Sequence, residues 1–465
     1  MTMKKIVIFA AALLLMSSCG VYNKYERPDV ATKGLVRDAV RDRDTLAVQD
    51  TASFGNLPWR SVFTDPQLQA LIEQGLEKNA NLQNAALNVE MYETMLKAAK
   101  LAFLPAVQIG SQASPMASYT TLHTDPSATT KAYSLPVSAS WTLDLFGNVL
   151  SQKRSTQMKL LGMKDHQMAV RAQLVSGIAN SYYTLLMLDR QLQIVTEMSQ
   201  LTKETWEMME MQYRLGRVRS TSVQSAEAAY LSMQTQANDM RRQIRSTENA
   251  LSLLIGDAGH QIARSTLEEQ ALPTEFATGV GVALLQNRPD VHQAEMALAA
   301  CFHDVQTARS QFYPSISVGA SATFSNSNGA MNPGKWLTTL FANLTQPIFM
   351  RGALTANLKV TKLQYEQAFN TWQNAILSAG NEVSNALVNY NSYDANSKLE
   401  AQRIEVLTKN VADTKALYQQ SGSSYLEVLT AQTQLLNAQI NKVTDDFYKM
   451  QAVVSLYTAL GGGGK

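Results

Sequence analysis

Hydrophobic positions in two parts of the chain follow the same helical rhythm. They recur at spacings of three and four residues between 82 and 103, and again between 291 and 312, at a constant offset of 209 residues. These positions are Leu82, Ala85, Val89, Tyr92, Leu96, Ala99 and Phe103, then Val291, Ala294, Leu298, Cys301, Val305, Ala308 and Phe312. Each run ends at a proline, Pro105 or Pro314, and proline stops a helix. The pattern predicts a helix that leads directly into a strand in each half.

Alternation of apolar residues with mostly small polar residues, with few faults, marks 133–145 and 316–325. Successive side chains of a strand point to opposite faces, so each strand has one apolar face. The lengths suit membrane strands of about 9–11 residues, although a half-buried soluble sheet alternates in the same way. A fourth strand is expected at about 337–349, where the alternation is poor and Pro347 interrupts it.

Four strands cannot close a barrel in lipid. The smallest closed membrane barrels have about eight strands, and open sheet edges are not tolerated within the hydrocarbon. If the sheet is a membrane sheet, the chain must therefore share one barrel with copies of itself.

Long helices follow the strands. More than 60 residues without proline lie between the second strand and Tyr213, with an apolar stripe from Val170 to Val195. The return segments, 223–254 and 429–457, place apolar residues three and four apart. A period of 3.5 residues is typical of coiled-coil pairing.

We interpret the chain as two copies of helix, strand, strand, long helix, turn and helix. Tyr213-Arg214-Leu215-Gly216 recurs as Tyr418-Gln419-Gln420-Ser421-Gly422, and Leu254-Ile255-Gly256 recurs as Ala459-Leu460-Gly461. The expected segments are a signal at 1–18, a linker at 19–60, the first repeat at 61–256, a connector at 257–283, the second repeat at 284–461 and a tail at 462–465.

The first residues resemble a bacterial lipoprotein signal. Lys4 and Lys5 precede an apolar run from Ile6 to Met16, and the small Ser17 and Ser18 precede Cys19. This resemblance implies cleavage before Cys19 and its acylation, and several acyl chains give stable anchoring. An ordinary signal peptide followed by an incidental cysteine is the alternative.

Composition narrows the function classes. Lys and Arg number 40 and Asp and Glu 38, and the excess lies at Lys4 and Lys5, so the rest of the chain is formally neutral. Neutrality disfavours nucleic-acid binding, which depends on neutralising phosphates. Two cysteines exclude a disulfide framework, and the five histidines lack metal-ligand spacing. We expect no catalysis and no cofactor. A cluster of methionines, Met208, Met209 and Met211, could indicate copper efflux. We favour a role in core packing, because methionine is a common core residue.

Several motifs, taken in order on a duplicated chain, resemble outer-membrane efflux channels of the TolC family. They are Trp59-Arg60-Ser61-Val62-Phe63-Thr64-Asp65-Pro66 and Asn287-Arg288-Pro289-Asp290-Val291. Cys19 followed by Tyr25-Glu26-Arg27-Pro28 is similar to the start of the lipidated, NodT-like subfamily. The resemblance covers nearly all of residues 19–460.

The resemblance implies an α+β membrane protein that works as a homotrimer. Four strands per chain would form one β-barrel in the outer membrane, continued by a long coiled-coil α-helical barrel into the periplasm. The connector 257–283 would join an equatorial belt around the tunnel. The implied partners are a periplasmic adaptor, an inner-membrane pump and outer-membrane lipid.

The resemblance also implies roles for the two turns. Leu215, Gly216, Ser220 and Gly422 are candidates for docking the adaptor. Asp413, five residues before Tyr418, is a candidate for a carboxylate ring that narrows the periplasmic gate. An outward-facing Asp413 paired with Lys409 or Lys415 is the alternative.

The predicted function is a passive exit duct for small toxic molecules in a tripartite efflux pump. The outer-membrane component of a type I protein-secretion system is one alternative. A lipid-anchored periplasmic coiled-coil scaffold is another, from a different class.

Overall fold

The computed structural model describes residues 23–29, 54–117, 129–271, 288–326, 335–420 and 425–464. Cys19, Gly422 and the last part of the predicted connector, from residue 272, lie outside the described residues. The chain divides into two units. Unit 1 comprises residues 1–30, 88–164 and 293–373, and unit 2 comprises residues 31–87, 165–292 and 374–465.

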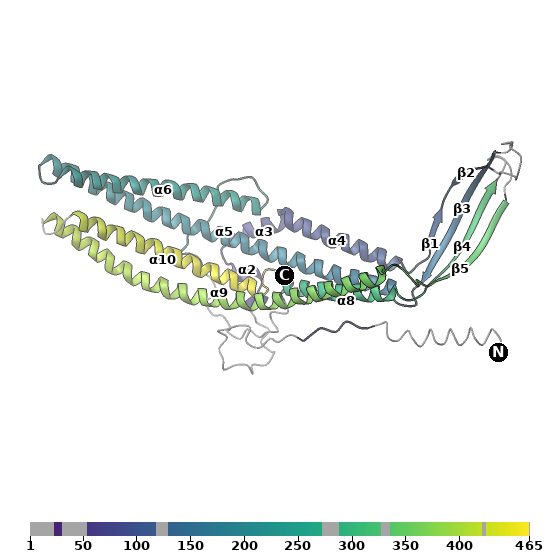
Figure 1. Cartoon of the computed structure of the whole chain (residues 1–465). Coiled ribbons are helices and arrows are strands. Elements are labelled where there is room, and N and C mark those ends of the chain that lie inside the picture. The colour runs from purple at the N-terminus through teal and green to yellow at the C-terminus, as the bar shows by residue number, and fades with distance from the viewer. Residues whose placement is uncertain are drawn as a thin grey trace. The chain divides into compact units, whose positions relative to one another are not determined.

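Helix lengths repeat between the two halves of the chain (Figure 1). The 22-residue helices α4 (Ala80–Leu101) and α8 (Pro289–Ser310) precede the strands. The 67-residue helices α5 (Asn148–Arg214) and α9 (Ala353–Gln419) follow them. The return helices α6 (Ser220–Leu254) and α10 (Tyr425–Ala459) have 35 residues each. The duplicated α+β architecture predicted from the sequence is confirmed.

Unit 1 holds an antiparallel sheet in which β1 (Ala106–Ile109) and β2 (Gln112–Ala117) both pair with β3 (Thr129–Leu143). The register is continuous from Ile109 opposite Val137 to Gln112 opposite Ser134. Pro136 lies opposite the break and has no N–H to donate, although its carbonyl accepts from Gly110 N at 2.9 Å. We therefore treat β1 and β2 as one interrupted strand of a four-stranded sheet.

The remaining strands, β4 (Ser315–Asn326) and β5 (Lys335–Thr345), complete the order β1/β2–β3–β4–β5. Their register brings the alternating apolar positions onto one face. Row by row these neighbours are Leu143, Ile316 and Leu344; Trp141, Val318 and Ala342; Ala139, Ala320 and Leu340; Leu135, Phe324 and Trp336. Leu340 is 86% exposed, so the described residues leave this face uncovered at β5. The two outermost strands have no further strand beside them among the described residues.

The opposite face of the sheet is mostly small and polar, although β5 places Leu337 and Phe341 on it. Gly319 lies between Ser140 and Phe341, and the Phe341 ring occupies the space above the glycine. A Cβ at position 319 would lie 2.4 Å from this ring and 2.6 Å from the Ala139 carbonyl oxygen. Glycine is therefore required at this position of β4, between β3 and β5.

Two strands end earlier than the sequence predicts. The strand predicted at 133–145 ends at Leu143, because the Asp144 carboxylate accepts hydrogen bonds from Val149 N (3.1 Å) and Leu150 N (2.8 Å) at the start of α5. The strand predicted at 337–349 spans 335–345 instead, so Pro347 lies beyond it. The poor alternation assigned to this strand came partly from including residues after its end.

Unit 2 packs the return helices against the long helices. Apolar residues of α10 at the predicted spacing are buried, among them Leu436, Val443, Phe447, Val454 and Tyr457. The short helices α2 (Trp59–Val62) and α3 (Pro66–Lys78) precede α4, and Trp59, Val62, Phe63, Leu68 and Ile72 are at most 3% exposed. The Trp59–Pro66 motif thus contributes to the core of this unit.

Candidate functional site: helix turns, anchoring contacts and sheet

The turn after α5 is closed by a glycine. Gly216 has φ +74°, and its N–H donates to the Tyr213 carbonyl at 2.9 Å. Arg217 N donates to the Gln212 carbonyl at 2.9 Å, which completes a Schellman-type end. Leu215 is 62% exposed, and Ser220 is the exposed first residue of α6. In the single chain, the turn therefore exposes one apolar and one hydroxyl side chain to solvent.

Tyr418 joins the ends of the two long helices. Its hydroxyl on α9 donates to Gln212 Oε1 on α5 at 2.9 Å and lies 3.3 Å from Met209 Sδ. Met209 is fully buried, whereas Met211 is 65% exposed. The contact sets the last turns of α5 and α9 side by side in unit 2.

Asp413 lies on the exposed surface of α9. Its possible partner Lys409 forms an ion pair with Glu405 at 3.0 Å. Exposed apolar residues share this face of α9, because Leu399, Val406 and Leu417 follow each other at intervals of 7 and 11 residues, and Asp413 lies four residues before Leu417.

The segment 23–29 is fastened to unit 1 by two side chains. The Tyr25 ring meets Phe302 edge-on, with the centroids 5.6 Å apart. Arg27 forms an ion pair with Glu295 at 2.9 Å, and its guanidinium lies over the Trp372 ring, 5.4 Å from the centroid. The Tyr25-Glu26-Arg27-Pro28 motif thus holds the segment 23–29 against α8 and α9.

The Trp59–Pro66 motif contains a buried carboxylate, that of Asp65. Asp65 caps α3, accepting from Gln67 N at 2.9 Å. It also accepts from Tyr182 Oη at 2.6 Å, Ser265 Oγ at 3.1 Å and Gln270 Nε2 at 2.8 Å. Burial raises the pKa of this carboxyl, but the hydrogen bonds outweigh burial and hold the pKa below its ordinary value. Asp65 therefore fastens the start of the connector to α3 and α5.

Two largely buried arginines complete this set of contacts in unit 2. Arg264 of the connector pairs with Glu248 of α6 at 2.7 Å and with Asp189 of α5. Arg288, 8% exposed, pairs with Asp290 and Glu382 at 2.7 Å each and donates to the Ala459 carbonyl at the end of α10. Arg288, from the motif that opens the second repeat, thus connects the start of α8 to the end of α10.

Replacing Tyr182 by phenylalanine should lower the free energy of unfolding by about 1–3 kcal/mol at neutral pH, because a charged, buried acceptor loses a hydrogen bond. The lowered pKa means that Asp65 stabilises the fold above about pH 4 and loses this contribution as pH falls through its folded pKa. The difference between wild type and variant should therefore shrink below about pH 4.

Thermal unfolding in detergent from pH 3 to pH 8 measures this effect. Tyr183→Phe is the matched control, because Tyr183 is equally buried but makes none of the hydrogen bonds at Asp65. A loss of stability in the Tyr182 variant that does not change with pH would contradict the role of the Asp65 carboxylate.

Sequence reasoning missed these polar contacts. Asp65 meets residues 117, 200 and 205 positions away, and Arg264 meets Asp189 over 75 positions. Periodicity reports on neighbours three or four residues apart, so it does not detect such pairs. The motif residues Asp65 and Arg288 were the available signals.

In the described part of the chain, no helix is apolar enough over a sufficient length to cross a membrane. The same residues contain no group of three or more His, Cys, Asp or Glu side chains placed to hold a metal ion.

Comparison with known proteins agrees with the duplicated architecture. The family profile for outer membrane efflux protein matches residues 71–257 and 280–462. The chain is 27% identical over 470 residues to the cation efflux system protein CusC of Escherichia coli (strain K12), covering 99% of each chain. It is 28% identical to the solvent efflux pump outer membrane protein SrpC of Pseudomonas putida, covering 100% of this chain and 99% of that protein.

A solved structure of CusC superimposes with a TM-score of 0.82 at 26% identity, over 95% of this chain and 99% of that one. The family match extends over most of the chain and includes both repeats. The chain belongs to the outer membrane efflux protein family.

Proposed function

We propose that three copies of this chain form the exit duct of a tripartite efflux pump, receiving small molecules from an inner-membrane pump through a periplasmic adaptor. The observation that carries the proposal is the four-stranded sheet, whose outer strands are unpaired and whose apolar face is uncovered among the residues that the structure describes. Such a sheet is unstable in lipid unless its edges are paired, and three copies supply twelve strands for closure. The family's efflux role favours this duct over a periplasmic scaffold.

A stripe on α9 supports assembly of the helices as well. Leu377, Val388, Leu399, Val406 and Leu417 are 48–66% exposed and follow each other at intervals of 11, 11, 7 and 11 residues. Such intervals keep side chains on one face of a helix. Exposed apolar side chains aligned on one helix face are unfavourable in solvent, and a neighbouring copy would cover them.

Reconstitution of the purified protein in planar lipid tests the duct. We expect a trimer in detergent and discrete conductance steps, enhanced by substitutions that loosen the contact of Tyr418 with Gln212. A monomer in detergent, or no conductance from loosened variants, would refute the duct.

The substrate follows from the pump partner in this proposal. The relatives are divided between a cation efflux system and solvent efflux, and their chains are equally similar to this one. A duct that serves such different pumps is expected to select weakly, so substrate choice lies upstream of it.

The turns are proposed as the adaptor-docking ends, with Leu215, Gly216, Ser220 and Gly422 as the contact residues. The exposure of Leu215 and Ser220 supports this role for the first turn. Cys19 is proposed as the lipidated residue, and the fastening of Tyr25 and Arg27 to unit 1 supports a short tether between lipid and protein.

Asp413→Asn should reduce the cation preference of the open channel severalfold if three copies of this carboxylate surround one axis. Its place on the apolar stripe of α9 supports a position where copies meet. Reversal potentials in asymmetric salt measure the preference. Glu405→Gln is the matched control, since it removes one charge from the same helix at an exposed ion pair. Unchanged selectivity in Asp413→Asn would remove this residue from the gate.

A further inference from the structure

A pocket between α8 and α9 in unit 1 combines cations with an apolar floor. It has a volume of about 280 Å³ and is lined by Phe302, Val305, Gln306, Arg309, Lys362, Tyr365 and Glu366. Phe302, Val305 and Tyr365 are at least half-buried, whereas Arg309 and Lys362 are exposed. The arrangement suits a ligand with an anionic end and an apolar end.

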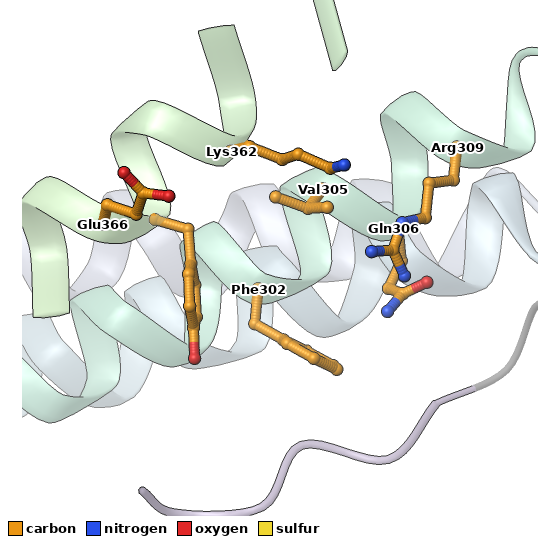
Figure 2. Close-up of a pocket in the computed structure, with 7 residues that line it drawn as sticks. Phe302, Val305, Gln306, Arg309, Lys362 and Glu366 are labelled. Carbon is orange, nitrogen blue, oxygen red and sulfur yellow. The ribbon is translucent and has the colours of Figure 1, made fainter. Parts of the chain in front are cut away.

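The two cations share this pocket without an acidic neighbour between them. Figure 2 shows Lys362 extending over Val305 toward Arg309, while the carboxylate of Glu366 lies beyond the other end of the lysine side chain. Glu366 stands four residues after Lys362, the spacing at which an ion pair on a helix is expected. Other cations of unit 1 do pair, such as Lys159 with Asp304 at 3.3 Å and Lys164 with Glu93 at 2.9 Å. An anion between Arg309 and Lys362 would offset their mutual repulsion.

The connection to the sheet places this pocket close to the membrane surface. Arg309 is the next-to-last residue of α8, and β4 begins six residues later at Ser315. The apolar face of β4 starts at Ile316. Headgroups add roughly 5–8 Å on each side of the hydrocarbon core, which is within reach of a long basic side chain at this end of α8.

The N-terminal segment gives a second, independent indication of the same level. Phe302 lines the pocket and also contacts the ring of Tyr25. Tyr25 lies six positions after Cys19, and six extended residues span at most about 22 Å. A lipid on Cys19 would therefore hold the pocket near the same membrane surface as the strands do.

We propose that this pocket binds the headgroup of an anionic phospholipid in the leaflet next to the helices. Arg309 and Lys362 contact its phosphate, and Phe302, Val305 and Tyr365 contact the first methylenes of its acyl chains. The inference rests on the proposed membrane barrel, because only that places lipid beside the pocket. A bound phospholipid here would join α8, which leads into β4, to α9, which follows β5.

The experiment uses the full-length protein in detergent after lipid removal, titrated with phosphatidylglycerol and followed by native mass spectrometry. The test variant is Arg309→Ala with Lys362→Ala. The matched control is Lys97→Ala with Lys359→Ala, which removes two exposed cations of the same unit outside the pocket. We expect at least tenfold weaker phosphatidylglycerol binding in the test variant and less than a twofold change in the control. Zwitterionic phosphatidylethanolamine should bind the wild type more weakly.

Two results would overturn the proposal. One is equal phosphatidylglycerol affinity in wild type and test variant, and the other is displacement of the lipid by millimolar inorganic phosphate, which would identify a site for free anions. Conductance of the same preparations reports on the duct separately. Normal conductance without a difference in lipid binding refutes the pocket alone, whereas a clear lipid difference without conductance refutes the duct alone.

Discussion

Gly319→Val is expected to prevent stable formation of the sheet, although valine is among the best strand formers. The new Cβ would lie 2.6 Å from the Ala139 carbonyl oxygen and 2.4 Å from the Phe341 ring, and both are closer than real contacts allow. The ring can turn away, but the carbonyl belongs to the β3 backbone and moves only with its strand. We expect a loss of about 3 kcal/mol or more, together with loss of the trimer.

The measurement is the mass of the detergent-solubilised protein by light scattering, with thermal unfolding on the same samples. Ser321→Val is the control, because it places valine two residues further along the same strand and on the same face, between Ser138 and Thr339. Adding Phe341→Ala to Gly319→Val should restore assembly only in part. A trimer of normal stability in the single variant would show that close packing of Gly319 against β3 and Phe341 is not required.

Arg264→Ala is expected to lower the free energy of unfolding by about 3–5 kcal/mol. The substitution leaves the Glu248 carboxylate, whose side chain is 5% exposed, as a buried charge without its partner. It also frees Asp189 of α5 from the connector. Hydrogen bonds to Asp189 and Glu248 raise the pKa of Arg264 above its ordinary value, against the effect of burial, so the guanidinium is charged at every relevant pH. Arg264→Lys should recover part of the loss.

The neighbouring ion pair provides an unusually close control. Arg190, next to Asp189, pairs with Glu268 of the same connector at 2.8 Å, but the two side chains are 35% and 59% exposed. Arg190→Ala should therefore cost about 1 kcal/mol or less. Thermal unfolding and the rate of proteolysis within 257–271 compare the two variants. Similar effects of both substitutions would mean that burial of Arg264 does not govern its contribution.

The sequence was sufficient to predict the elements that repeat. The helices at 82–103 and 291–312, the strands after Pro105 and Pro314 and the long helices are all found, because each is marked by periodicity or proline over many residues. Boundaries were less accurate where one residue decides them, as Asp144 does at the end of β3 and Pro136 does at the break between β1 and β2.

The roles of the motifs could be predicted less well than their presence. The Trp59–Pro66 motif identified a family, but nothing in its spacing indicated that Asp65 accepts hydrogen bonds from residues near 182, 265 and 270. The alternation alone places Gly319 among the polar-face positions of its strand, because its contact with the Phe341 ring depends on the register of β5. The roles of Asp413 and of the two turns stay predictions, because they concern contacts with other chains.

The matched lengths of the two repeats restrict how the chain can change in evolution. Tyr418 and Gln212 hold the last turns of two 67-residue helices in step. An insertion confined to α5 would carry Gln212 away from Tyr418 and would also require a longer α6. Homologous channels with longer or shorter helices are therefore expected to differ by whole heptads. We expect such a change to occur together in all four helices, α5, α6, α9 and α10. Isolated single-residue insertions in these helices should be rare among natural relatives.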